Sequence, residues 1–172
     1  MSNYKGHIAG GTVAGIVYAG VITTYVEVAN AGISFGLGGS WQFPAILVIL
    51  SILFGLWPDI DTNSKGQDIF YSGMFVLNVW LIYQKQYQLS AFLGLLAMLP
   101  ILGKHRGWTH SRLTMFIIPL PILLIPYASS DVGSWSGAPY YGAAVVGLAS
   151  HLFLDGLMFK KPRVLKRFSK IF

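Results

Sequence analysis

Long apolar runs separated by short polar stretches dominate the chain. Six runs can be distinguished, at about residues 7–29, 43–57, 69–83, 89–102, 113–127 and 140–159. An apolar run that crosses a bilayer must be helical, because lipid offers no hydrogen bonds to exposed backbone groups. The pattern therefore predicts an all-α integral membrane bundle of about six transmembrane helices. Several runs are shorter than the roughly 17–25 residues that span a hydrocarbon core, so we expect them to extend into their flanks or to thin the bilayer.

The composition supports a membrane-embedded protein. The chain is 54% hydrophobic and only 10% charged, whereas a soluble domain carries about 25% charged residues. Residues 1–159 are expected to form a single transmembrane domain, and residues 160–172 a basic tail on the membrane surface that is either a topology anchor or a lipid-binding element. The first run has no obvious small-residue cleavage site, so we expect a retained helix and no signal peptide. The chain has no cysteine, which excludes disulfides and thiolate zinc sites.

The positive charges predict the orientation of the helices. With six crossings, eleven of the twelve Lys and Arg residues fall on the face that holds both termini, and only Lys85 falls on the other. By the positive-inside rule the first face is cytoplasmic. The protein is thus expected in the inner membrane, with its N- and C-termini in the cytoplasm. The net charge of +6 is explained by these flanking positions, so no nucleic-acid partner is expected.

Histidines and acids gather on the same predicted face. His7 opens the first run, and the second ends at WPDIDT with Asp59 and Asp61. The segment KHRGWTHS joins the fourth and fifth runs, and SHLFLDG lies near the end of the sixth. These segments contribute His105, His110, His151 and Asp155.

The spacing of these groups favours a metal site. His151 and Asp155, four residues apart, share one face of a helix. Asp59 and Asp61 project the same way if their segment is extended. Thr109 or Ser111 can cap the fifth helix, and Asp68 the third. Glu27 and Asp131 are given no chemical role.

Imidazoles and carboxylates without thiolates suit zinc, with manganese or iron as further candidates. The seven predicted ligands, more than one tetrahedral ion needs, favour one or two ions; they are His7, Asp59, Asp61, His105, His110, His151 and Asp155. Arg106 is the predicted catalytic residue, holding an anionic group with its planar fork. Each group, taken alone, also has a structural explanation. His7 can be an interfacial histidine, and Asp59 and Asp61 can cap a turn. His105 and Arg106 can be solvated loop charges, and His151 and Asp155 a buried hydrogen-bonded pair.

At PDID, HRGWTHS and SHLFLDG, from about residue 7 to 155, the sequence resembles the YdjM-like family of inner-membrane metal-dependent hydrolases. That family is also described as LexA-binding and SOS-associated. The resemblance implies that the seven predicted ligands are the metal-site residues. One position departs from the family pattern, since Thr62 stands where a histidine follows the paired acids.

The expected function is divalent-metal-dependent hydrolysis of an ester or phosphoester in a lipid or lipid-linked substrate. The site would open where lipid head groups lie, and membrane lipids are the expected partners. One alternative is a non-enzymatic metal transporter or sensor, which would place polar groups near the midplane along a path across the membrane. The other is a regulatory membrane partner that docks through the basic tail.

Overall fold

The computed structural model describes residues 4–29, 41–60, 65–102, 108–129 and 135–158, and these residues form helices and turns without any strand. The α-helices are α1 (Tyr4–Ala29), α2 (Gln42–Leu56), α3 (Lys65–Tyr83), α4 (Tyr87–Leu102), α5 (Arg112–Ile117), α6 (Leu120–Ser129) and α7 (Ala138–Leu154). Short 3-10 turns are η1 (Trp57–Asp59), η2 (Trp108–His110) and η3 (Trp135–Gly137). The predicted all-α class is confirmed.

Every predicted apolar run contains helix, but the predicted number of membrane crossings is not established. Two helical stretches, Tyr4–Tyr25 and Gln42–Asp59, are long and apolar enough to cross a membrane by length and composition. Tyr87–Leu99 and Arg112–Ala128 are apolar but shorter. Six crossings therefore stay a prediction.

Prolines divide the fifth apolar run, as its sequence suggests. The last backbone bond of α5 runs from the Ile118 N–H to the Thr114 carbonyl at 3.0 Å. Pro119 follows, and it has no N–H with which to continue the ladder. A new turn then starts where the Ile122 N–H donates to the Pro119 carbonyl at 2.9 Å. The run thus becomes two short helices, α5 and α6.

Small residues let α1, α2 and α7 pack closely around Ser51. The Ser51 hydroxyl donates to the Gly11 carbonyl on α1 at 2.9 Å. On the α7 side, a Cβ added at Gly147 would lie 2.9 Å from the Ser51 carbonyl carbon and even nearer its oxygen. Glycine at such contacts allows two helix backbones to approach in a way that any side chain would prevent. These three helices form the centre of the molecule, with Leu47 and Phe54 of α2 buried between them.

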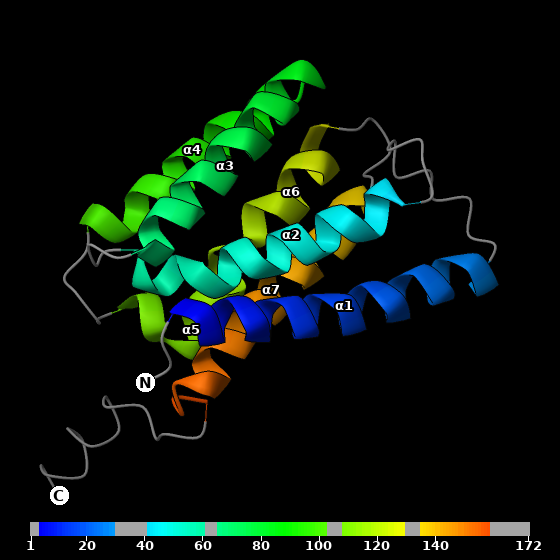
Figure 1. Ribbon diagram of the computed structural model, residues 1–172. Coiled ribbons are helices and arrows are strands. Elements are labelled where there is room, and N and C mark those ends of the chain that lie inside the picture. Colours follow the sequence, from blue (N-terminus) through cyan, green and yellow to red (C-terminus); the bar gives the residue numbers. More distant parts are fainter. Residues whose placement is uncertain (1–3, 30–40, 61–64, 103–107, 130–134, 159–172) are drawn as a thin grey trace, which may run out of the picture.

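α3 and α4 form a hairpin that lies at an angle to α1 and α2 (Figure 1). Its turn is closed by two backbone bonds, from Lys85 N–H to Ile82 carbonyl at 2.9 Å and from Gln86 N–H to Leu81 carbonyl at 2.8 Å. The Asn78 amide donates to the Ser90 carbonyl at 3.1 Å and joins the two helices near that turn.

The ends of four helices meet at one end of the bundle. Figure 1 shows the start of α1, the end of α2, α5 and the end of α7 gathered there. All the predicted site residues that the structure describes belong to these four segments or their flanking turns. The fold therefore brings together groups that are as far apart in sequence as His7 and Asp155.

Candidate metal centre

Four side chains converge at this end of the bundle. His7 lies in the first turn of α1, Asp59 in η1, His151 in the last turn of α7, and Asp155 is the C-cap of α7. Each offers one ligand atom, and these atoms all lie within 4.8 Å of one another. Both histidines are buried, at 1% and 0% exposed, and the Asp155 side chain is 2% exposed. Asp59 is 31% exposed, so the cluster reaches the surface at this carboxylate.

The distances between the four groups suit a shared cation better than direct hydrogen bonds. His7 Nε2 lies 3.5 Å from Asp59 Oδ2 and 3.6 Å from Asp155 Oδ1. His151 Nε2 lies 3.9 Å from Asp59 Oδ1 and 3.8 Å from Asp155 Oδ2. N–H···O bonds are normally about 2.7–3.2 Å long. Tetrahedral ligands at about 2.1 Å from a zinc ion are about 3.4 Å apart, which is close to these four histidine–carboxylate distances.

The hydrogen bond of His151 orients its ring toward the carboxylates. His151 Nδ1 lies 2.9 Å from the Gly55 carbonyl oxygen, which can only accept, so Nδ1 carries the proton. In the neutral ring, Nε2 then presents a lone pair to Asp59 and Asp155. Metal-ligating histidines characteristically donate their other N–H to a carbonyl or carboxylate in this way.

Buried nitrogen atoms in the cluster have no hydrogen-bond partner among the described residues. They are His151 Nε2 and both ring nitrogens of His7. Buried polar groups are normally satisfied, and each exception needs an explanation. One lone-pair nitrogen of each imidazole and the two carboxylates make a set of acceptors, and a divalent cation satisfies this set at once. The residues present therefore fit a metal ion.

His110 adds a fifth group beside the cluster. Its Nε2 lies 3.2 Å from Asp59 Oδ1, and its Nδ1 lies 3.0 Å from the Thr109 hydroxyl. The His7 and His151 rings are stacked with centroids 4.0 Å apart, and the His110 ring meets His151 edge-on at 5.2 Å. The three imidazoles thus form one contiguous group beside the carboxylates.

The position of His110 follows from the cap of the next helix. Ser111 is the N-cap of α5, and its hydroxyl accepts from the Thr114 N–H at 3.1 Å. Of the two predicted caps, Ser111 is therefore the one used. The cap begins α5 immediately after η2, which fixes His110 on the side of Asp59.

The structure brings together five of the seven predicted ligands, namely His7, Asp59, His110, His151 and Asp155. The other predicted site residues, Asp61, His105 and Arg106, lie outside the described residues, as does the basic tail.

An extended segment, in which Asp59 and Asp61 would project the same way, is not found at Asp59, which ends a 3-10 turn that continues directly from α2. Pro58 is accommodated near the start of that turn, where its missing N–H is not needed. The third helix begins at Lys65, so Asp68 lies inside its first turn and not at the cap position.

Two orienting groups could not be found from the sequence. The Gly55 carbonyl is a backbone atom, which residue-type patterns do not reveal. The Thr109 hydroxyl is adjacent to a histidine in sequence, but only the turn geometry directs it to the ring nitrogen.

The YdjM inner membrane protein family matches residues 1–169, which is nearly the whole chain. The chain belongs to this family. No curated protein and no solved structure matches it. Membership of the YdjM inner membrane protein family explains the apolar outer surface of α1 and α3, where Val13, Val17, Phe75 and Val76 are 62–70% exposed. Apolar surface on this scale is stable against lipid and not against water.

Proposed function

We propose that this YdjM-family chain is a six-span inner-membrane hydrolase that uses a divalent metal to cleave an ester or phosphoester bond in a lipid or lipid-linked substrate. The observation that carries the proposal is the set of buried imidazole nitrogens that face two carboxylates and have no hydrogen-bond partner within the described parts of the chain. Ionisable groups buried in a membrane protein are costly to retain and mark functional sites.

Each residue of the cluster has a distinct part in this proposal. His7, His151, Asp59 and Asp155 hold the ion, and the Gly55 carbonyl keeps His151 in the tautomer that can bind it. A divalent ion, with zinc as the first candidate, would activate water and polarise the scissile carbonyl or phosphoryl group. The four ligand atoms are spaced for one ion. A second ion would draw on His110 together with Asp61 or His105.

The substrate class is inferred from where the cluster lies. It is at the ends of α1, α2 and α7, and the partly exposed Asp59 is its route to the surface. Helix ends in a membrane protein lie at the depth of lipid head groups, where ester and phosphate bonds are found. Arg106, four residues before His110, is proposed to bind a phosphate. The charge distribution of the sequence supports a cytoplasmic location for this face and for both termini.

The apolar core of the described residues favours hydrolysis over transport. Above the cluster, Phe54, Leu148 and Ala144 are 1%, 1% and 0% exposed and fill the space between α2 and α7. A transporter needs polar groups along a path to the far side, whereas the buried polar side chain at this level of the described core, Ser51, is engaged in a hydrogen bond to the Gly11 carbonyl.

Metal content of the detergent-purified protein tests the site. The protein is purified without chelator, offered zinc or manganese, and analysed for bound metal. Wild type is expected to hold one to two ions per chain. Asp59→Ala is expected to lose metal, and His110→Ala, which removes the imidazole 3.2 Å from Asp59 Oδ1, is expected to bind it more weakly. Asp68→Ala serves as the matched control because this acid lies on α3 outside the cluster.

Hydrolysis is then measured on labelled membrane lipids, with release of fatty acid or of phosphorylated head group as the readout. Metal-dependent release by wild type and not by Asp59→Ala would support the enzyme. Stoichiometric metal without any release would indicate a non-enzymatic metal-binding protein. Absence of metal from wild type would refute both the hydrolase and the metal-binding protein.

A further inference from the structure

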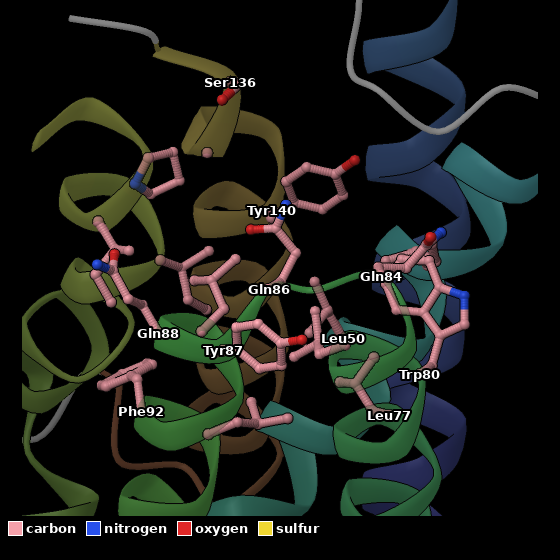
Figure 2. A pocket seen from close by; sticks show the side chains of 18 of the residues that line it. Leu50, Leu77, Trp80, Gln84, Gln86, Tyr87, Gln88, Phe92, Ser136 and Tyr140 are labelled. Carbon is pink, nitrogen blue, oxygen red and sulfur yellow. The ribbon is translucent and has the colours of Figure 1, made fainter. Parts of the chain in front are cut away.

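A second feature of the molecule lies away from the metal cluster. A cavity of about 740 Å³ opens between α2, the α3–α4 hairpin, α6 and α7. Figure 2 shows Leu77 and Trp80 of α3 with Gln84 of the turn on one side of it, and Gln88 and Phe92 of α4 on another. Gln86 and Tyr87 lie between the two sides. Its volume falls within the range of about 300–1,000 Å³ that is typical of small-molecule sites.

The cavity and the cluster are at different depths of the bundle. Leu50 of α2 lines the cavity and Asp59 follows nine residues later, a rise of about 13 Å along the helix. On α7, Tyr140 lines the cavity and His151 follows eleven residues later, a rise of about 16 Å. Phe54 lies between the two levels and is buried. The cavity is therefore a separate site that does not depend on bound metal.

The lining of the cavity divides into an apolar wall and a polar rim. The wall is built from aliphatic and aromatic side chains, among them Leu50, Leu77, Phe92, Ile122 and Ile125. The rim is a continuous stretch, Gln84–Gln88, at the turn of the hairpin. This division matches an amphiphile, which has an apolar chain and a polar head.

Lys85 gives the polar rim of the cavity a positive charge. Among the lining residues that the structure describes, it alone carries a charge. Its backbone has φ of 59°, a left-handed conformation that side-chain-bearing residues adopt infrequently. The backbone hydrogen bonds that the N–H groups of Lys85 and Gln86 donate in the turn stabilise this conformation. A cation without a nearby acid in the lining favours an anionic head group, and the amides of Gln84 and Gln86 can donate further hydrogen bonds to its oxygens.

We propose that this cavity binds one acyl chain of an anionic membrane phospholipid, with the head group held at Lys85 and the neighbouring glutamines. The membrane location of the family supplies such lipids at the hairpin turn. An apolar chain also restores the contacts that the aliphatic wall would otherwise lack. The site is thus a lipid-binding site distinct from the hydrolytic one, at the opposite end of α2 and α7.

Native mass spectrometry tests this proposal directly. Detergent-purified protein is incubated with equal amounts of phosphatidylglycerol, which is anionic, and phosphatidylcholine, which is zwitterionic, with identical chains. Wild type is expected to retain one lipid per chain and to prefer phosphatidylglycerol about fivefold, which corresponds to about 1 kcal/mol. Lys85→Gln is expected to lose this preference and Lys85→Arg to keep it.

A matched pair of variants tests whether the acyl chain occupies the cavity. Leu77→Trp places a large ring in the cavity, and Val76→Trp places the same ring on the exposed side of the same helix. Lipid retention is expected to fall at least tenfold in the first and to stay unchanged in the second. Equal retention in both, or no lipid on wild type, would overturn the proposal. If Leu77→Trp fails to fold, the Lys85 variants still decide, because that residue is exposed on a turn and an unchanged preference in Lys85→Gln would refute the proposed head-group site.

Discussion

Gly147→Ala is the substitution that tests the packing of the central helices most directly. Its Cβ would lie 2.9 Å from the carbonyl carbon and 3.0 Å from the Cα of Ser51. Optimal carbon–carbon separations are about 3.5–4.0 Å. These two contacts alone require α7 to move away from α2 by at least about 0.6–1 Å, and the obstacle is backbone that no rotamer change can clear.

The free-energy change follows from two opposing effects. Overpacking of this kind costs about 1–3 kcal/mol, whereas alanine is better than glycine in a helix by up to about 1 kcal/mol. We expect Gly147→Ala to lower the free energy of unfolding by about 1–2 kcal/mol. Gly20→Ala on α1 is the matched control, because a Cβ there meets nothing within 4 Å, and it is expected to be neutral or stabilising by up to about 1 kcal/mol. Gly11→Ala, whose Cβ would lie 3.0 Å from the Ser51 carbonyl oxygen, is expected to fall between them.

Equilibrium unfolding in mixed micelles, with increasing SDS and helicity as the signal, measures this series. Metal content of the same samples gives an independent readout, since α2 leads into Asp59 and α7 carries His151. Separation of the two helices is expected to weaken metal binding in Gly147→Ala and not in Gly20→Ala. Equal stability of these two variants would refute the close packing of α2 and α7 and the reasoning built on it.

Three further predictions concern the hydrogen bonds and the ion. Thr109→Val removes the hydroxyl 3.0 Å from His110 Nδ1 and is expected to weaken metal binding about 10–100-fold, as measured by competition with a chelating dye. The control is Thr24→Val on the exposed face of α1. An affinity of Thr109→Val equal to that of the control would rule out an orienting role for Thr109. Ser51→Ala removes the bond to the Gly11 carbonyl and is expected to cost about 0.6 kcal/mol, at most about 1.7, in the same SDS titration; a stabilised protein would contradict it. Zinc at 100 times its dissociation constant is expected to stabilise wild type by about 2.7 kcal/mol and to leave the alanine variants of the cluster unchanged, which thermal unfolding with and without chelator will show.

The apolar runs predict the helices well because hydrophobic length is a local property of the sequence. The runs at 43–57 and 69–83 agree with α2 and α3 to within a few residues. The number of crossings is harder to predict, since α4 has 16 residues and α7 has 17, close to the lower limit for a spanning helix. Whether such helices cross the bilayer depends on their tilt and neighbours, which the sequence does not specify.

The residues of the site were predictable because few other groups in the chain can bind a metal. With four histidines, six acids and no cysteine, the polar groups that membrane helices retain are nearly all candidates. Their arrangement was less predictable. The 3-10 turn at Asp59 depends on how α2 ends against its neighbours, and the Gly55 carbonyl reaches His151 only through the packing of α2 on α7.

The cluster joins the beginning of the chain to its last described helix. His7 and Asp155 are 148 positions apart, and at about 5–20 residues per second the ribosome makes the second about 7–30 s after the first. During that interval the nascent protein has the first imidazole of the centre but lacks α7, so it cannot assemble the ligand set. Under the proposed metal centre, loading therefore follows the synthesis of α7, because His151 and Asp155 complete the ligand set. An ion held by the proposed centre would link the first turn of α1 to the last turn of α7, so that the two ends of the described chain stabilise each other.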